Sequence, residues 1–417
     1  SREGRAIRAL KGGQIMAESM GVNTFRSKLI VFIIASVFAS ISGWLYAHNQ
    51  TFINPSPFSL QMGIDYLFMA LLGGVGSVWG AILGSGIFTM MRQWLQDYLP
   101  MFLGNDGQYE TIVFGLLIVA LMQKAPMGLW PMIMKIIPKK IKPLDQHIQM
   151  KETDQKLTCQ AMPNKGDVVL EAKNVTKKFG GLVANNDMSL QVHAGEILAL
   201  IGPNGAGKST MFNQLSGVDT PTSGEVIFKG EKINGQYSRK IAQQGMSRTF
   251  QHVKILAEMT VLENVAIGGH LRGHQGVFSS LLRLDRVEEN ILLNEAKLQL
   301  ERVGLGEYLY AEAGSLALGQ QRILEIARAL CSDPCVLLLD EPAAGLRLKE
   351  KEALAALLLK LKAEGMAILL VEHDMDFVMN LVDRIVVMEF GQKIAEGLPE
   401  EIQKNEAVLE AYLGGAA

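Results

Sequence analysis

A run of small residues between an expected strand and an expected helix is the clearest chemical signal. It follows the apolar stretch 196–201 and comprises Gly202, Pro203, Asn204, Gly205, Ala206, Gly207, Lys208, Ser209 and Thr210. Its glycines let backbone N–H groups turn toward phosphate oxygens, and the positive end of the next helix faces the same anions. Lys208 would neutralise phosphate charge, and the Ser209 hydroxyl would bind Mg²⁺. A glycine turn without nucleotide would not need the Lys-Ser pair, so the run predicts a phosphate-binding loop.

Two carboxylates directly follow a second apolar stretch, residues 336–339. They are Asp340 and Glu341. Ligands of open α/β sheets bind at the carboxyl ends of the strands. We expect Asp340 to hold Mg²⁺, usually through water, and Glu341 to polarise the attacking water as a general base. Acids often cap strand ends, so the pair gains its significance from the phosphate-binding loop upstream.

A histidine lies at the end of a third apolar stretch, residues 366–372. It is His373, in the sequence Val-Glu-His-Asp. A lone histidine is usually structural. At the end of a strand in the same sheet, however, His373 could reach the γ-phosphate and hold the attacking water in line.

Residues from about Val168 onward alternate short apolar stretches with polar, helix-prone ones. This alternation predicts an α/β domain with a largely parallel sheet and a helical insert. The whole chain has 417 residues, 48% of them apolar and 20% charged, which excludes a disordered protein. The formal net charge of −2 gives no support for a nucleic-acid partner. Three cysteines cannot form a disulfide scaffold and lack histidines at metal-binding spacing.

The first 135 residues contain three long uncharged runs. They cover 29–47, 66–91 and 111–123. A membrane span needs about 20 apolar residues, which the first two runs supply. The third is short unless Lys124 snorkels or lies inside a helix bundle. We therefore expect a set of N-terminal α-helical transmembrane segments rather than buried helices of a soluble core.

Basic residues flank these runs on both sides, in 1–28 and again in 135–142. Both ends should therefore be cytoplasmic, which requires an even number of crossings. Three runs fit this if 66–91 is a broken or re-entrant segment, as its many glycines suggest. Gly76, Gly80 and Gly84 could serve close helix packing or line a substrate path, and both readings stay open. Three runs are too few for a permeation pathway, so we expect an N-terminally truncated membrane protein.

The motifs together resemble those of ATP-binding cassette ATPases. Gln251 matches the Q-loop glutamine, which contacts Mg²⁺ and couples to the membrane domain in that family. The stretch 316–321 is similar to the family signature, so Gly319 and Gln320 would cap the ATP of a partner. Phe179 sits where the family stacks an aromatic ring on adenine, 344–347 occupies the D-loop, and His373 matches the H-loop histidine. The resemblance covers 168–417 and implies ATP and Mg²⁺ as cofactors.

Finer details resemble one branch, the branched-chain amino acid importers. Residues 1–134 resemble part of the permease, with 1–28 as the cytoplasmic docking loop. Residues 135–165 are charged and polar and contain three prolines, which predicts a linker. The resemblance implies an ATPase domain with the α/β P-loop NTPase fold over 166–417. It implies a second cassette subunit or copy, permease subunits, an extracytoplasmic solute-binding protein and membrane lipid as partners. It also implies a bacterial-type inner (plasma) membrane location, with the ATPase domain in the cytoplasm.

Several alternatives remain open on sequence alone. Related importers carry other amino acids, small amides or urea, and a truncated ATPase without transport coupling is a further reading. A soluble cassette ATPase of DNA repair or translation conflicts with the uncharged N-terminal runs. Ala317, Leu318 and Arg347 depart from the usual signature and D-loop residues, which leaves open whether two ATP sites are equal. The sequence does not decide between homo- and hetero-assembly, or whether the permease part is complete enough to transport.

Overall fold

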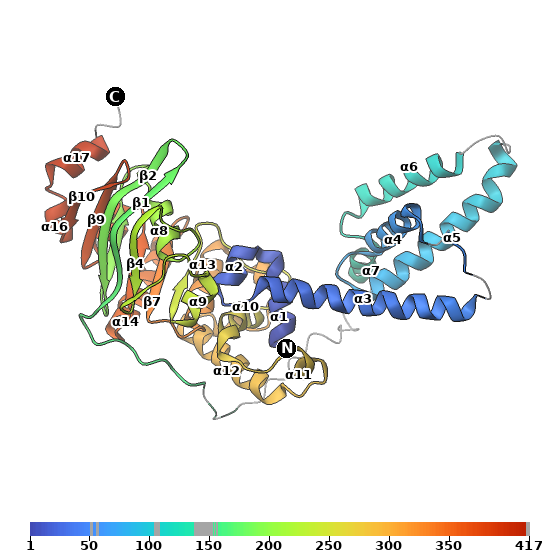
Figure 1. Cartoon of the computed structure of the whole chain (residues 1–417), viewed down its shortest axis with the longest axis horizontal. Coiled ribbons are helices and arrows are strands. Elements are labelled where there is room, and N and C mark those ends of the chain that lie inside the picture. The colour runs from blue at the N-terminus through green and yellow to red at the C-terminus, as the bar shows by residue number, and fades with distance from the viewer. Residues whose placement is uncertain are drawn as a thin grey trace. The chain divides into compact units, whose positions relative to one another are not determined.

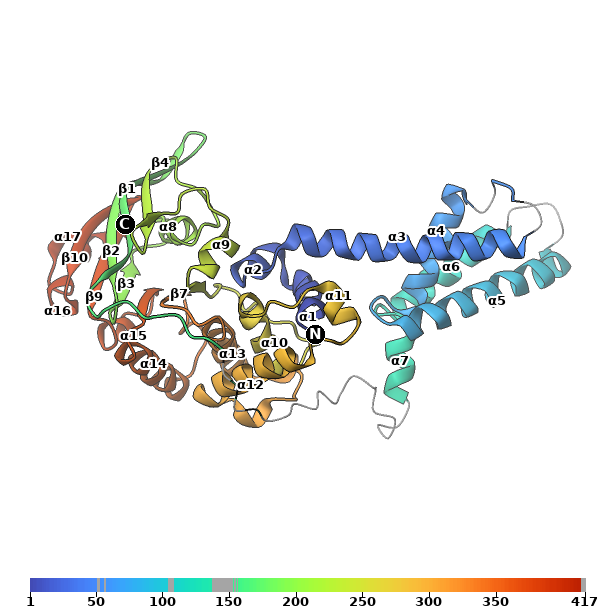
Figure 2. The ribbon, with the colours of Figure 1, turned by 60° about the horizontal axis from the view of Figure 1, so that its bottom comes forward.

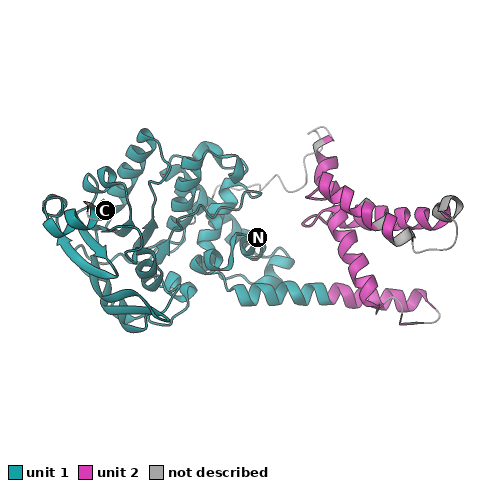
Figure 3. Cartoon of the chain, turned by 90° about the horizontal axis from the view of Figure 1, so that it is seen from above, with its two compact units in different colours: residues 1–36, 150–417 teal, residues 37–149 magenta. Residues whose placement is uncertain are grey.

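The structure is a computed structural model that describes residues 1–50, 53–55, 58–103, 109–136, 153, 155 and 157–413. The chain divides into two compact units (Figure 3). The first unit combines residues 1–36 with 150–417, and the second covers 37–149. The expected linker 135–165 lies mostly outside the described residues. The predicted domain boundaries remain a prediction.

Two sheets form the centre of the first unit (Figure 1). The six-stranded sheet has the order β10-β9-β3-β8-β7-β6, and its strands β9, β3, β8, β7 and β6 are parallel. The four-stranded sheet, β2-β1-β4-β5, is antiparallel. The strands are β1 (Val168–Phe179), β2 (Leu182–His193), β3 (Ile197–Ile201), β4 (Ser223–Phe228), β5 (Glu231–Lys232), β6 (Met246–Arg248), β7 (Val336–Asp340), β8 (Ala367–Val371), β9 (Arg384–Glu389) and β10 (Gln392–Gly397). The parallel sheet was expected, whereas the antiparallel one was not predicted.

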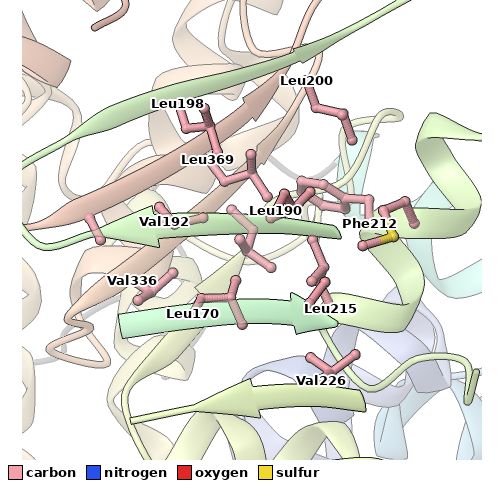
Figure 4. Close-up of a cluster of buried hydrophobic side chains, with 14 of the residues drawn as sticks. Leu170, Leu190, Val192, Leu198, Leu200, Phe212, Leu215, Val226, Val336 and Leu369 are labelled. Atoms are coloured by element: carbon pink, nitrogen blue, oxygen red, sulfur yellow. The ribbon is translucent and has the colours of Figure 1, made fainter. Parts of the chain in front are cut away.

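The central strand β3 is buried on both faces because its side chains alternate between two cores. Leu198 and Leu200 join the core that β1, β2 and helix α8 (Lys208–Leu215) cover (Figure 4). Ile197, Ala199 and Ile201 join the opposite core, beneath helices α13 (Leu318–Leu330) and α14 (Leu348–Ala363). Such double burial explains why the strand appears in the sequence as an unbroken apolar stretch.

Helices cover the six-stranded sheet and build a helical region beside it. The region contains α10, α12 and α13, which contact one another. The helices that come after β3 along the chain are α8 (Lys208–Leu215), α9 (Ser238–Gln243), α10 (Val261–Gly268), α11 (Val277–Leu281), α12 (Arg286–Arg302), α13 (Leu318–Leu330), α14 (Leu348–Ala363), α15 (Met375–Met379), α16 (Pro399–Ile402) and α17 (Glu406–Leu413). Short 3-10 turns are η1 (Leu10–Gly12), η4 (Gly269–Arg272), η5 (Gly306–Tyr308) and η6 (Ala313–Ser315). The predicted helical subdomain is therefore present.

The first 28 residues, called here the N-terminal segment, pack onto the same unit. They form α1 (Arg2–Ala9), η1, α2 (Gln14–Ser19) and the start of α3 (Thr24–Asn49). Their small apolar side chains meet Leu256, Met259 and Ile267 in one buried group, the N-terminal cluster. Its members from the segment are Ala6, Ala9, Met16, Ala17, Met20 and Val22. The packing makes this segment part of the first unit (Figure 2).

The boundary between the two units lies within α3 (Figure 3). Among the described residues, α3 is the one helix that is long and apolar enough to span a membrane by itself. Its large side chains stand in the open, with Phe32 69% and Phe38 67% exposed. This is what a lipid-facing helix requires. The other helices of the second unit are α4 (Leu60–Gly73), α5 (Val78–Leu103), α6 (Tyr109–Lys124) and α7 (Leu129–Ile136).

The break expected within 66–91 lies between α4 and α5. These helices form an apolar pair bent by 119°, which fits a broken span or a re-entrant loop. A Cβ on Gly73 or Gly84 would collide with the facing backbone, at Gly80 O and Met69 O respectively. The Arg92 guanidinium also pairs with the buried Asp65 carboxylate across the two helices. Gly80 and Gly84 thus serve the close packing of α4 on α5.

Candidate functional site

Four neighbouring parallel strands bring the predicted residues to one edge of the six-stranded sheet. Gly202 follows β3, His373 follows β8 and Glu341 follows β7. Gln251 comes three residues after β6. The order β3-β8-β7-β6 therefore assembles residues far apart in the chain. The strands β3 and β8 are slightly shorter than the expected stretches 196–201 and 366–372, and the flanking Glu196 and Glu372 use their side chains to accept hydrogen bonds from backbone N–H groups.

The glycine-rich run forms a loop that wraps the start of α8. Gly202, Gly205 and Gly207 adopt positive φ angles, which residues with a Cβ rarely take. The Lys208 ammonium donates to the carbonyl oxygens of Gly202 (2.6 Å) and Pro203 (2.9 Å). These two hydrogen bonds hold the Lys208 side chain against the turn of the loop. Ser209 and Thr210 occupy the first turn of α8, where helix N–H groups are free to bind an anion.

Glu341 lies at the centre of the polar cluster. Its Oε1 accepts a hydrogen bond from the Gln251 side-chain amide (3.2 Å), and His373 Nδ1 lies 3.9 Å from its Oε2. Glu341 adopts a φ of +48°, which turns it out of the strand while its N–H donates to Val371 O (2.9 Å). Such strained backbone is common at functional sites. The structure thus brings Gln251, Glu341 and His373 together.

Burial sets the charge states around the loop. It lowers the pKa of Lys208 below its ordinary value, while the carboxylates of Glu341 and Asp340 oppose this change. Burial also raises the pKa of Asp340, which Arg248 partly offsets. A buried carboxylate with nearby cations is a strong candidate for ligand binding. Asp340 oxygen, the Ser209 hydroxyl and the Gln251 amide oxygen are hard donors of the kind that Mg²⁺ prefers.

Phe179 lies at the end of β1, in the antiparallel sheet. Its ring is 50% exposed and carries the Lys177 ammonium at 4.9 Å from its centroid. A half-exposed ring could accept a base by stacking. The same hairpin reaches the phosphate-binding loop through β2, because Asn185 Nδ2 donates to Gly207 O (3.2 Å).

The predicted signature residues begin helix α13. The Gln320 side chain accepts the N–H of Ala317 (3.1 Å) and so caps the helix. Gly319 packs against the Glu350 carboxylate of α14, where a Cβ would lie 2.5 Å from Oε1. No hydrogen bond or ion pair within the described part of the chain joins Gly319 or Gln320 to the phosphate-binding loop. The structure therefore does not unite these two with the other predicted site residues.

Several supporting residues were missed by the sequence reading. The buried Glu372 carboxylate accepts the N–H of Ala343 (2.6 Å) and of His373 (3.1 Å), and so joins the turn after β7 to the histidine. Its position next to His373 was the only sequence signal.

A second missed pair lies in α13. Glu325 accepts the Lys254 N–H (2.7 Å) and Arg328 donates to Lys254 O (2.6 Å), which holds the stretch after Gln251 against this helix. The two side chains are also paired with each other at 3.1 Å, and burial raises the pKa of Glu325. Their spacing in a helix gave no sign of this contact.

Comparisons with known protein families place three matches along the chain. Residues 1–122 match the permease component of a branched-chain amino acid transport system. Residues 185–344 match the ABC transporter family, and residues 392–417 match the branched-chain amino acid ATP-binding cassette transporter family.

Curated relatives match the C-terminal part. The high-affinity branched-chain amino acid transport ATP-binding protein LivG of Escherichia coli K12 is 44% identical over 251 residues, 60% of this chain and 98% of its own length. The probable LivG of Archaeoglobus fulgidus is 38% identical over 246 residues, 59% of this chain and 95% of its own.

Solved structures show the same fold. A nucleotide-free ATP-binding cassette from an ABC transporter superposes with a TM-score of 0.53 at 33% identity, covering 59% of this chain and 99% of its own. The ADP conformation of an ATP-binding cassette also gives 0.53 at 33% identity, covering 60% and 99%. The chain therefore belongs to the branched-chain amino acid ATP-binding cassette transporter family, and it joins a permease segment to an ATP-binding cassette ATPase in one polypeptide.

Proposed function

We propose that this chain hydrolyses ATP at the edge of its six-stranded sheet to drive uptake of branched-chain amino acids. The observation that carries the proposal is the meeting of four strand ends, where Gln251 donates to Glu341 at 3.2 Å beside His373. The cargo is inferred from the permease match and from the LivG-type relatives.

In this proposal the phosphate-binding loop holds the ATP phosphates. Lys208 exchanges the Gly202 and Pro203 carbonyl oxygens for phosphate oxygens. Mg²⁺, held by Ser209, Gln251 and Asp340, would supply charge neutralisation on the phosphates. Phe179 would stack on the adenine. Each of these roles follows from the residue's chemistry and its place around the loop.

Glu341 then acts as the general base on the attacking water. Gln251 and His373 flank its two carboxylate oxygens and fix its orientation. His373 is 63% exposed, so it is accessible to the γ-phosphate and to water. General bases of this kind contribute about 10²–10⁴-fold to rate.

A complete site in this proposal needs a second cassette. Gly319 and Gln320 lie away from their own chain's loop and would cap the ATP of a partner cassette. Permease partners follow from the family, and we extend them to an extracytoplasmic solute-binding protein and to membrane lipid. The N-terminal segment would dock on the cassette from the cytoplasmic side of an inner (plasma) membrane.

The test is ATP hydrolysis by the full chain reconstituted in lipid with its permease partners. Glu341→Gln keeps the shape of the side chain but removes the base, so we expect kcat to fall at least about 10²-fold with ATP binding retained. The exposed Glu352→Gln is the matched control, and it should leave the rate unchanged.

A solute-binding protein loaded with leucine, isoleucine or valine should stimulate hydrolysis in the wild-type chain. Stimulation by urea or another amino acid instead would reassign the cargo. A rate that Glu341→Gln leaves intact would remove Glu341 from the mechanism. Hydrolysis that no loaded binding protein stimulates would mean an ATPase without transport coupling.

A further inference from the structure

A buried arginine beside the site has no part in the proposed chemistry. Arg248 ends β6, three residues before Gln251, and is only 6% exposed. Burial lowers its pKa to about 10, against the opposing charge of Asp340, so the guanidinium keeps its charge near neutral pH. A buried cation must be compensated by specific partners, and those partners show what the residue connects.

One side of the guanidinium contacts the helix that follows the phosphate-binding loop. Its Nη1 donates to Asn213 Oδ1 (3.0 Å) and to Ser216 Oγ (2.6 Å), both at the end of α8. The fully buried Phe212 ring of the same helix lies 4.9 Å from Cζ. Arg248 thereby binds α8 through two hydrogen bonds and a cation–π contact with Phe212.

The other side faces the N-terminal segment. The Phe250 ring lies 4.8 Å from Cζ, so the guanidinium is within stacking distance of two rings. Phe250 packs in turn against the N-terminal cluster, which contains Met16 and Met20. Arg248 and Ser216 also line a small cavity together with Ser19 of α2.

Taken together, these contacts form a continuous chain from the N-terminal segment to α8. We infer that Arg248 is a positioning residue through which the docked N-terminal segment fixes α8 and thereby the affinity of the loop for ATP. The inference rests on the proposed function. A planar guanidinium can stack on two rings and donate at its edge at the same time, which an ammonium cannot do. The Arg248→Lys variant should therefore keep the charge and lose the connection.

A double-mutant cycle on the full chain in lipid nanodiscs tests this inference, with ATP alone as the probe. Arg5→Glu perturbs docking, because the largely buried Arg5 pairs with Glu289 of α12, and no hydrogen bond or ion pair in the described residues joins Arg5 to Arg248. We expect Arg5→Glu to raise the KM for ATP about fivefold, and less than about twofold when Arg248 is already lysine, a coupling of at least about 0.5 kcal/mol. The value of kcat should change little.

Arg239→Lys is the matched control. Arg239 also stacks on a ring, that of Tyr237 at 4.8 Å, but no hydrogen bond or ion pair in the described structure joins it to α8 or to the N-terminal segment. The full Arg5→Glu effect should persist in this background. Thermal unfolding of each variant checks folding, and Phe250→Leu replaces Arg248→Lys if the lysine variant does not fold.

The outcomes separate the two proposals. Equal effects of Arg5→Glu with Arg248 and with Lys at this position would overturn the role of Arg248, and so would an Arg5→Glu variant with unchanged KM. If the wild-type chain does not hydrolyse ATP, or if the Glu341→Gln variant hydrolyses it as fast as the wild type, the proposed function is overturned instead.

Discussion

At the scale of single residues, the site includes a buried carboxylate, Glu372, that has no direct part in the proposed chemistry. Glu372 is 1% exposed, and burial raises its pKa. It holds two backbone N–H groups, one before the D-loop and one at His373. Glu372→Gln turns one of its acceptor oxygens into a donor that faces an N–H group, which should displace His373.

We expect Glu372→Gln to lower kcat for ATP about tenfold, since charge-assisted hydrogen bonds are worth about 1.5–3 kcal/mol. KM should change less, because the loop that binds the phosphates is untouched. Steady-state hydrolysis measures both constants. A variant in which KM rises and kcat falls by similar factors, with a lowered unfolding temperature, would show a general structural role instead.

At the scale of elements, the bend between α4 and α5 depends on glycine at only some positions. Gly84 faces the α4 backbone, and a Cβ there would collide with Met69 O. Gly86, two residues later on the same helix, faces open space. The two positions share their helix and their residue type, and they differ in what they face.

We expect Gly84→Ala to lower the unfolding midpoint of the detergent-solubilised chain and Gly86→Ala to leave it unchanged or slightly raised. Overpacking a close contact costs about 1–3 kcal/mol, whereas alanine in an open helix position is favourable by up to about 1 kcal/mol. Thermal unfolding compares the two. Equal midpoints would mean that α4 and α5 do not meet at Gly84.

At the scale of the whole molecule, the proposed function requires more than one cassette. Lys208→Ala removes the loop cation, and Gly319→Asp places a carboxylate at the signature beside Glu350. In a head-to-tail pair, each ATP would lie between the loop of one copy and the signature of the other. Each variant alone therefore damages both sites of a pair.

A mixture of the Lys208→Ala and Gly319→Asp chains should regain hydrolysis that neither shows alone, because mixed pairs contain one intact composite site. Rates before and after mixing measure this. No recovery, with both variants folded, would indicate that the second cassette is a different subunit.

Local patterns in the sequence determined a large part of this protein. The glycine-rich run, the acids after an apolar stretch and the histidine after another predicted the phosphate-binding loop and its neighbours. The uncharged runs predicted the helix α3, the bent pair of α4 and α5, and the helix α6. These features are local, because the spacing of residues along a strand, turn or helix is enough to reveal them.

Only the tertiary structure decided which of these residues meet. The strand order β3-β8-β7-β6 places Gln251 next to Glu341, and no local pattern encodes that order. Glu372, Arg248 and the Glu325–Arg328 pair were missed for the same reason, since their partners lie on other elements. The contact of Gly319 with Glu350 of α14 likewise joins two elements that no local pattern connects. Burial and long-range contact decide these positions, and both arise only when the chain is folded.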